Sequence, residues 1–386
     1  MTAALPGYMR EFSDAAPGHR FSLYYAGWNT DFSKPPGGAT KTLKGDVCPL
    51  PKHSRDLQRS IEARQAALAA DASAVFTYPA IATAPFATGL GNEHPLENGF
   101  SFLSPYGLPY LPGSGVKGVI RKAAEELAGG EWGQAQGWDE DSIRGFFGPG
   151  EEDPNRDSNP QQGALRFWDV FPAPETSVKN DRPLLTVEIM TPHLGTYYQG
   201  DATPKTSLTP NPIAFLAVAA KSRFAFHVEC NLAVLTPAQQ NIWQTLLQSA
   251  FDHAGKWLGF GAKTAVGYGR MKVDEGAKEQ LARQAAAAER IRRQASLSHA
   301  MREIEAFIEY FAKRAEQLAG RKERPNGADH QKAGALAKTA LEASDWTQEE
   351  KAAAGDAIGA WLPQVVAVDI KEVRKKLRLS TLRGPS

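Results

Sequence analysis

Two stretches of the chain carry apolar residues at helical spacing, three or four positions apart. In the first, apolar residues recur from Val116 to Leu127, and Gly129 and Gly130 follow as a stop signal. The second opens with Thr236-Pro-Ala-Gln239, which reads as a capping box with proline at the first helical position. We therefore predict amphipathic helices over 115–128 and 237–258, each burying its apolar stripe against a sheet, with Trp257 in the second stripe.

Short stretches rich in β-branched and aromatic residues lie before, between and after these helices, which predicts strands. The last two read as a hairpin that turns at Lys221-Ser222. The order of strands and helices predicts an α+β fold with a βαββαβ core and long insertions. The predicted strands are 75–78, 81–88, 164–170, 184–190, 213–219 and 223–230, with a short one after 270.

The two ends of the chain differ from this core in pattern. At the N-terminus, only Phe21–Ala26 looks like a strand, 35–51 reads as a loop and 57–70 as a helix. From about residue 275 the pattern is helical throughout, with 321–329 as a predicted hinge. An apolar stripe runs from Ile304 to Leu318, Thr347-Gln-Glu-Glu350 reads as a capping box, and Asp369 opens the last helix. We predict a domain over 1–272 and an all-helical C-terminal lobe over 273–386, whose last, basic helix either touches RNA or is a solvated face.

Composition adds few restrictions. The 386 residues carry a net charge of +1, so any nucleic-acid surface has to be a local patch. The two cysteines, Cys48 and Cys230, show neither disulfide nor zinc-ligand spacing, and no cofactor or metal motif is present. No signal peptide and no run of roughly 18 apolar residues occurs. We expect a soluble cytoplasmic protein with no membrane partner.

Gly259-Phe-Gly-Ala-Lys-Thr-Ala-Val-Gly-Tyr-Gly-Arg270 follows the second helix and packs four glycines into twelve residues. Glycine is most useful where φ is positive or where a ligand approaches the backbone closely. The cations and the tyrosine suit a phosphate backbone with attached bases, whereas the alternative is a turn between core elements. The candidate RNA-binding residues here are Gly261, Lys263, Thr264, Tyr268 and Arg270.

The first helix begins in a similar stretch, Leu111-Pro-Gly-Ser-Gly-Val-Lys-Gly-Val-Ile-Arg121. Its G-x-G-x-x-G spacing is not a dinucleotide fingerprint, because Pro109 and Pro112 interrupt the strand that the fingerprint requires. A cation in the first turn of a helix is repelled by the positive end of the helix dipole unless an anion is bound there. The position of Lys117 therefore indicates a phosphate site. The alternative is a solvated basic face. The candidate residues are Ser114, Gly115, Lys117 and Arg121.

These two stretches resemble motifs of the RAMP superfamily of CRISPR proteins, the first being similar to its Pro-Gly-Ser-Ser-hydrophobic-Lys-Gly pattern with Gly115 in place of the hydroxyl residue. Three further stretches are more particular. With the first two, and in this order, they resemble the family of sixth subunits of the type III-B Cmr effector over roughly residues 75–272. They are 89–99, Phe167-Trp-Asp-Val-Phe-Pro172, and Glu188-Ile-Met-Thr-Pro-His193 with Tyr197-Tyr198.

The resemblance implies a ferredoxin-like (RRM-like) RAMP fold. It also implies a non-catalytic backbone subunit of an antiviral ribonucleoprotein, which binds CRISPR RNA near the 3′ end of the guide. The implied partners are the other Cmr effector subunits and, indirectly, target RNA. His193, Tyr197 and Tyr198 join the candidate RNA-binding residues, since tyrosines stack on splayed bases.

Two other functions stay open. Some RAMP proteins are endoribonucleases that cleave repeat RNA with a histidine acid/base, so His94 and His193 must be weighed, although neither has a second acid/base nearby in sequence. The other alternative is a scaffold that binds only proteins. Asp169 is predicted to orient backbone or a subunit contact, and Trp168 to lie in the core. Lys117, Arg121, Lys263 and Arg270 are predicted to line one groove.

Overall fold

The computed structural model divides the chain into two compact units, Met1–Leu281 and Ala282–Ser386. The predicted border at 272/273 falls just before the long helix α8 (Glu275–Ser296), and the unit border falls inside that helix. The structure describes residues 12–33, 38–71, 74–96, 98–130, 137–150, 162–177, 180–181, 183–191 and 212–382, together with Tyr8 and Trp132.

A four-stranded antiparallel sheet forms the centre of the first unit. Its strand order is β10 (Met271–Val273), β1 (Val75–Ala82), β9 (Arg223–Cys230) and β4 (Leu165–Phe167). The register pairs Thr77 with His227. Along the chain these strands and the two long helices follow one another as β1, α4, β4, β9, α7 and β10. The predicted mixture of helix and sheet is thereby confirmed.

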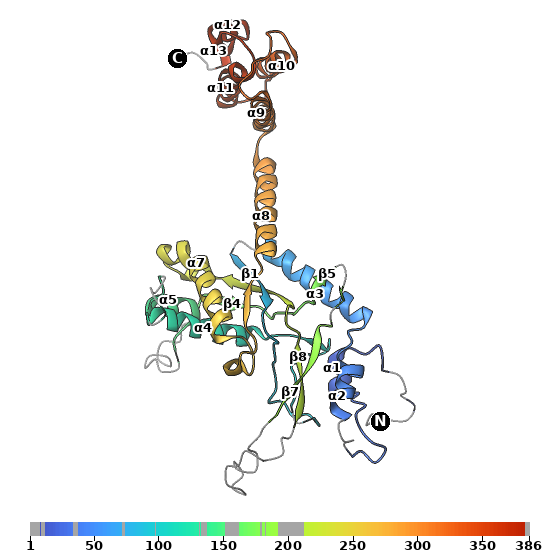
Figure 1. Ribbon diagram of the computed structural model, residues 1–386. Coiled ribbons are helices and arrows are strands. Elements are labelled where there is room, and N and C mark those ends of the chain that lie inside the picture. The colour runs from blue at the N-terminus through green and yellow to red at the C-terminus, as the bar shows by residue number, and fades with distance from the viewer. Residues whose placement is uncertain are drawn as a thin grey trace. The chain divides into compact units, whose positions relative to one another are not determined.

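The helices α4 (Gly113–Ala128) and α7 (Pro237–His253) cover one face of the sheet, whereas α3 (Lys52–Asp71) lies on the other side (Figure 1). Aromatic rings join helix to sheet: Tyr78 of β1 stacks on Phe251 of α7 at 4.8 Å between ring centroids. The capping box at Thr236 and Gln239 forms as predicted, and the π-helical turn η3 (Ala254–Leu258) extends α7 to Gly259.

The strands on either side of Lys221-Ser222 were predicted to pair with each other. Instead, β8 (Ile213–Val218) forms a separate two-stranded sheet with β7 (Leu185–Met190). The hairpin prediction is wrong because β8 pairs with β7, while β9 pairs with β1 and β4. Phe86 also exchanges backbone hydrogen bonds with Val218 at 3.0 and 2.7 Å, which ties the hairpin β7–β8 to the segment after β1. The Lys221 turn, at φ 70°, therefore links two sheets.

The N-terminal strand predicted over 21–26 is also wrong. Pro17 starts the helix α1 (Pro17–Ser22), which buries Phe21. Within the predicted loop 35–51 the structure forms α2 and η1. It also forms α5, which was not predicted from the sequence. The remaining short elements of the first unit are α2 (Gly38–Thr42), η1 (Leu43–Val47), β2 (Phe102–Leu103), β3 (Leu108–Pro109), α5 (Glu140–Phe147), β5 (Thr176–Ser177), β6 (Asn180–Asp181), η2 (Leu232–Val234) and η4 (Thr264–Val266).

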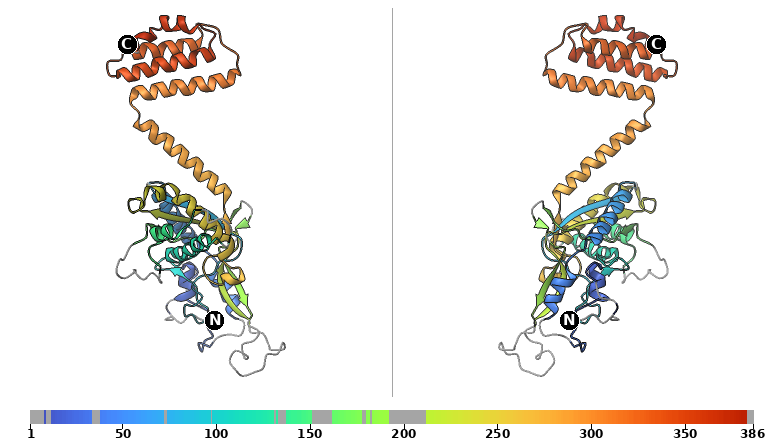
Figure 2. Two further views of the ribbon diagram at one scale, coloured as in Figure 1. Left: turned by 90° about the vertical axis from the view of Figure 1, so that its left-hand side faces the viewer. Right: turned by 90° about the vertical axis from the view of Figure 1, so that its right-hand side faces the viewer.

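The regular elements described in the second unit are helices joined by short loops. The helices α9, α10 and α11 pack against one another around a hydrophobic cluster of their own, which includes Phe307, Phe311 and Ile358 (Figure 2). The capping box at Thr347 and Glu350 forms, and Asp369 caps the last basic helix, both as predicted. The helices are α9 (His299–Leu318), α10 (Ala328–Glu342), α11 (Gln348–Val365), α12 (Ile370–Lys376) and α13 (Leu379–Leu382).

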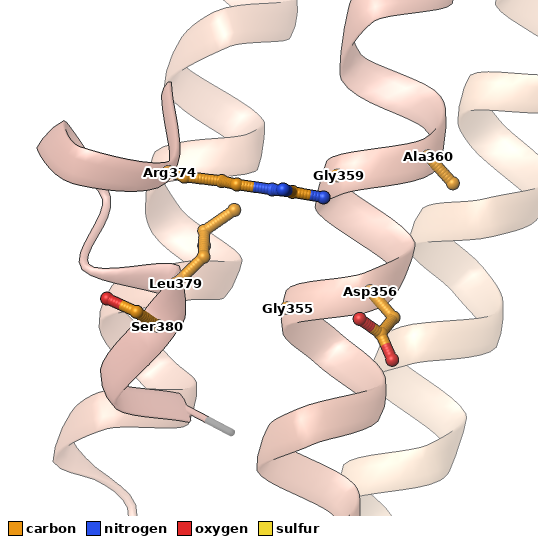
Figure 3. A pocket seen from close by; sticks show the side chains of 7 residues that line it. All are labelled: Gly355, Asp356, Gly359, Ala360, Arg374, Leu379 and Ser380. Carbon is orange, nitrogen blue, oxygen red and sulfur yellow. The ribbon is translucent and has the colours of Figure 1, made fainter. Parts of the chain in front are cut away.

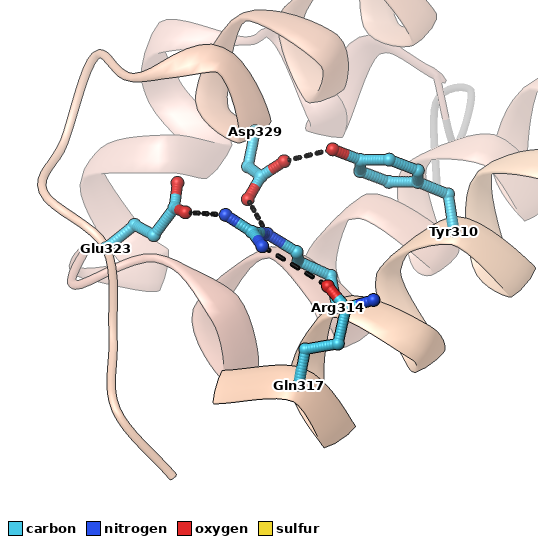
Figure 4. A network of polar contacts seen from close by, with 5 residues as sticks. All are labelled: Tyr310, Arg314, Gln317, Glu323 and Asp329. Atoms are coloured by element: carbon cyan, nitrogen blue, oxygen red, sulfur yellow. Dashed lines mark hydrogen bonds and ion pairs between the residues drawn. The ribbon is translucent and has the colours of Figure 1, made fainter. Parts of the chain in front are cut away.

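The predicted hinge at 321–329 is instead a pinned loop within this unit. The Arg314 guanidinium donates to Asp329 at 3.1 Å and also pairs with Glu323, and the Tyr310 hydroxyl donates to Asp329 at 2.6 Å (Figure 4). Asp329 is buried, and the Glu323 backbone binds the Val365 carbonyl at 2.8 Å. Because both ends of the loop are held, it cannot serve as a free hinge.

Candidate nucleic-acid interface

The glycine-rich loop, residues 259–270, is a closed structure fixed to the rest of the first unit. The Phe260 amide donates to the Gly269 carbonyl at 3.0 Å, which closes the loop at its base. The Ala262 amide donates to Ala87 at 2.7 Å, and the Gly269 amide donates to Pro85 at 2.8 Å. These bonds hold the loop against the segment that leaves β1.

Four glycines of this loop have positive φ, but three of them are required by the protein's own packing. A Cβ at Gly269 would lie 1.8 Å from the Phe260 carbonyl oxygen; at Gly261 it would lie 2.3 Å from Ala87 O, and at Gly259 2.6 Å from Tyr268 O. A Cβ at Gly267 would meet nothing within 4 Å. Only Gly267 therefore offers open backbone that a ligand can approach.

Lys263 and Tyr268 face the hairpin β7–β8. Lys263 has left-handed backbone, and its Nζ lies 2.8 Å from the Met190 sulfur and 5.4 Å from the centre of the Phe215 ring. The Tyr268 hydroxyl donates to Glu188 at 3.1 Å; partial burial, this hydrogen bond and the Glu188 charge raise the Tyr268 pKa to about 12. These two candidate residues therefore already have partners within the chain.

The N-terminus of α4 interacts with an anionic side chain of the protein itself, Asp169. The Gly113 amide donates to the Asp169 carboxylate at 2.8 Å, so Asp169 orients backbone as predicted. A Cβ at Gly113 would lie 2.1 Å from the Phe167 carbonyl oxygen, so this glycine is needed for close packing on the end of β4. The carboxylate takes the place at the helix N-terminus that the sequence suggested for phosphate.

The other candidate residues of α4 lie on its first two turns. Ser114 and Gly115 are exposed, and Lys117 is partly buried. Burial, and then the neighbouring charge of Arg121, lower the Lys117 pKa. Arg121 donates to Glu125 at 3.1 Å and to the Pro149 carbonyl at 3.3 Å, so its guanidinium is already engaged.

Among the described residues, no hydrogen bond or ion pair joins the start of α4 to the glycine-rich loop, so the shared groove of Lys117, Arg121, Lys263 and Arg270 remains a prediction. Arg270 is exposed, and within the described residues it forms no ion pair. His193, Tyr197 and Tyr198 lie outside the residues that the structure describes. Thr264 opens the short turn η4 in the loop and is half-buried.

An exposed aromatic pair adjoins the loop and was missed in the sequence, where Trp257 was assigned to the buried stripe of the second helix. Trp257 is 45% exposed, Trp132 is 49% exposed, and their ring centres lie 5.0 Å apart. Lys256 places its Nζ 4.8 Å from the centre of the Trp257 ring. Trp257 leaves the buried stripe because it lies in the π-helical turn η3, where the backbone no longer follows the 3.6-residue period of an α-helix.

The described histidine candidate is fully engaged in packing. His94 stacks on Phe21 at 3.7 Å, accepts the Leu96 amide at its Nδ1 (3.1 Å) and donates from Nε2 to the Phe21 carbonyl (2.9 Å). Trp168 is half-buried beside His227, at 5.3 Å between ring centres, instead of lying in the core. Over the described part of the chain, no group of three or more metal-ligating side chains is assembled, and no helix has the length and apolar character needed to span a bilayer.

Comparison with known proteins places this domain in a family. Cmr6 of the Pyrococcus furiosus CRISPR system is 28% identical over 225 residues, 47% of this chain and 63% of that protein, so the chain spans less than two thirds of its relative. Two solved structures also match. A chain of the type III-B Cmr-beta complex bound to cognate target RNA is 18% identical, and the match covers 61% of this chain and 69% of that one with a TM-score of 0.41. The crystal structure of Pyrococcus furiosus Cmr6 is 24% identical, and the match covers 52% of this chain and 97% of that one with a TM-score of 0.28. Residues 81–272 match the RAMP superfamily. The chain therefore carries a RAMP superfamily domain and is homologous to Cmr6 of Pyrococcus furiosus.

Proposed function

We propose that this chain is a non-catalytic, RNA-binding backbone subunit of a type III-B Cmr effector complex, placed near the 3′ end of the guide and stacked against the other subunits. The homology to Cmr6 supports the assignment to that complex. The strand order β10-β1-β9-β4, with one helix after β1 and one after β9, supports a ferredoxin-like (RRM-like) core.

The observation that carries RNA binding is the surface along residues 256–270. Lys256 and Arg270 are exposed, and neither forms an ion pair within the described residues. Trp257 presents half of its ring to solvent, and Gly267 leaves the backbone open. Cations that form no ion pair are available to neutralise phosphates, and an exposed aromatic ring stacks on bases. In this role Trp257 suits a base better than Tyr268, whose hydroxyl is held by Glu188.

A non-catalytic role agrees with the contacts of His94. Its Nδ1 accepts an amide and its Nε2 donates to a carbonyl, so neither nitrogen is available to move a proton between RNA atoms. We expect repeat-containing RNA to stay intact on incubation with the purified protein. RNA cleavage that disappears in His94→Ala or His193→Ala would establish the endoribonuclease alternative instead.

A salt series on guide-RNA binding by the full chain tests the proposal. Lys256→Ala and Arg270→Ala should each reduce the slope of log K against log[salt] by about 0.7, whichever guide sequence is used. Trp257→Ala should weaken binding by roughly 1–3 kcal/mol with the slope unchanged.

The matched control is Arg166→Ala, which also removes one exposed positive charge. Arg166 differs because it already pairs with Glu229 at 3.5 Å. If Lys256→Ala and Arg270→Ala bind RNA no differently from this control, residues 256–270 are not the RNA surface. Normal co-purification with other effector subunits in that case would favour the protein-only scaffold.

A further inference from the structure

The helix α12 and Arg378 just after it carry a concentration of positive charge that no ion pair among the described residues neutralises. Five exposed cations lie on α12 and just after it, and Glu372 is the one acid within that helix. Within the described residues, none of the five forms an ion pair. They are Lys371, Arg374, Lys375, Lys376 and Arg378.

Several cations on other helices of the unit are paired with acids, whereas the five between 371 and 378 lie close together in sequence with a single acid among them. Arg293 pairs with Glu305 at 2.7 Å, Lys313 with Glu309 at 3.0 Å, and Lys338 with Glu342 at 3.9 Å. The helix dipole accounts for cations in the last turn of α12, because they face its partial negative charge. It does not account for Arg378, which lies beyond the helix end, or for Lys371 in the first turn.

A cavity of about 360 Å³ adjoins these cations. Arg374 extends from α12 towards Gly359 of α11, and Ser380 lies on the same side (Figure 3). The wall on α11 has little side-chain bulk, because it is made by Gly355, Gly359 and Ala360; the Asp356 carboxylate also lines the cavity. A Cβ at Gly359 would meet nothing within 4 Å, so the space above this residue is open.

We propose that the surface of α12, together with this cavity, binds the phosphate backbone of single-stranded RNA as a second contact, separate from residues 256–270. Several unpaired cations on a single segment suit a polyanion, and a guanidinium beside a shallow cavity offers hydrogen bonds to phosphate. This inference rests on the proposed function only in that RNA is the ligand of the complex.

The test uses the full chain and a fluorescently labelled oligouridylate as the probe. The triple variant Lys371→Ala/Lys375→Ala/Lys376→Ala should lower the slope of log K against log[salt] by about 2, because each lost phosphate contact contributes about 0.7. The control Arg293→Ala/Lys313→Ala/Lys338→Ala removes the same charge from cations that are already paired, and its slope should stay close to that of the wild type.

A second variant tests the cavity without changing charge. Gly359→Leu fills the open space and should lower affinity for oligouridylate at an unchanged salt slope. Unchanged affinity would overturn the role given to the cavity.

An equal slope in the α12 triple and its control would overturn the proposal as a whole. So would a triple variant that binds oligouridylate normally but no longer co-purifies with a partner subunit, since α12 would then meet an acidic protein. Arg270→Ala, measured in the same titration, reports on the proposed function separately.

Discussion

Alanine substitutions in the glycine-rich loop distinguish a glycine that the protein's own packing requires from a glycine that leaves the backbone open to a ligand. At Gly267, φ is 97° and a Cβ would meet nothing within 4 Å, so Gly267→Ala carries only the left-handed backbone cost of roughly 1–2 kcal/mol. At Gly269, φ is 71° and a Cβ would lie 1.8 Å from the Phe260 carbonyl oxygen. Overpacking adds about 1–3 kcal/mol there, so Gly269→Ala should destabilise the first unit by roughly 2–5 kcal/mol.

Urea titration read by hydrogen exchange of the β1 and β9 amides measures this cost, because it reports the first unit separately from the helical one. Affinity for guide RNA is measured alongside. We expect Gly267→Ala to stay folded and to bind RNA more weakly, because it obstructs the one open glycine. Equal destabilisation by Gly267→Ala and Gly269→Ala would refute the packing argument. Normal RNA affinity of Gly267→Ala would show that no ligand approaches there.

Three further predictions concern the polar side chains of His227, Asp169 and Asp329, each of which the fold holds in fixed contacts. Burial lowers the His227 pKa to about 4, so the first unit should lose up to about 3 kcal/mol as pH falls from about 6.5 to about 4, and His227→Gln should flatten that dependence in urea titrations. Asp169→Ala should cost the first unit roughly 0.5–2 kcal/mol by freeing the Gly113 amide, whereas Asp169→Asn keeps an acceptor and should cost less, as thermal unfolding will show. Burial alone would raise the pKa of Asp329, but hydrogen bonds from Tyr310 and Arg314 hold it below its usual range. The helical unit should therefore lose stability as pH falls below about 4. Asp329→Ala should cost it roughly 1–3 kcal/mol, measured by circular dichroism, because Tyr310 and Arg314 each lose a hydrogen bond while Arg314 keeps its pairing with Glu323.

Local signals in the sequence predicted the long helices well. The capping boxes at Thr236 and Thr347 act within a single turn, and both form as read. The stripe from Ile304 to Phe311 is buried as its spacing indicated. Such features depend on residues close together in the chain, so the sequence contains all that is needed to find them.

Strand pairing could not be found in the same way. The turn at Lys221 looks like a hairpin loop, yet the partner of β8 is β7 and its further neighbour is Phe86, which lies far away in sequence. The same limit applies to the loop glycines. Gly267 and Gly269 stand in nearly the same local context, and only the folded chain shows that one faces open space and the other the Phe260 carbonyl.

The packed glycines also help to explain how residues 256–270 could bind RNA. Gly259, Gly261 and Gly269 let the loop close on its own backbone, and the bond from Tyr268 to Glu188 ties it to the hairpin β7–β8. A loop fixed in this way loses little conformational entropy when a ligand binds, so its contacts count more fully toward affinity. Lys263 and Tyr268 would then act as positioning residues, while exposed Lys256, Trp257 and Arg270 contact the RNA. On this reasoning Tyr268→Phe, which loses only the bond to Glu188, should weaken RNA binding about as much as Tyr268→Ala, and both should weaken it less than Trp257→Ala does. A much larger loss in Tyr268→Ala than in Tyr268→Phe would return the stacking role to the Tyr268 ring.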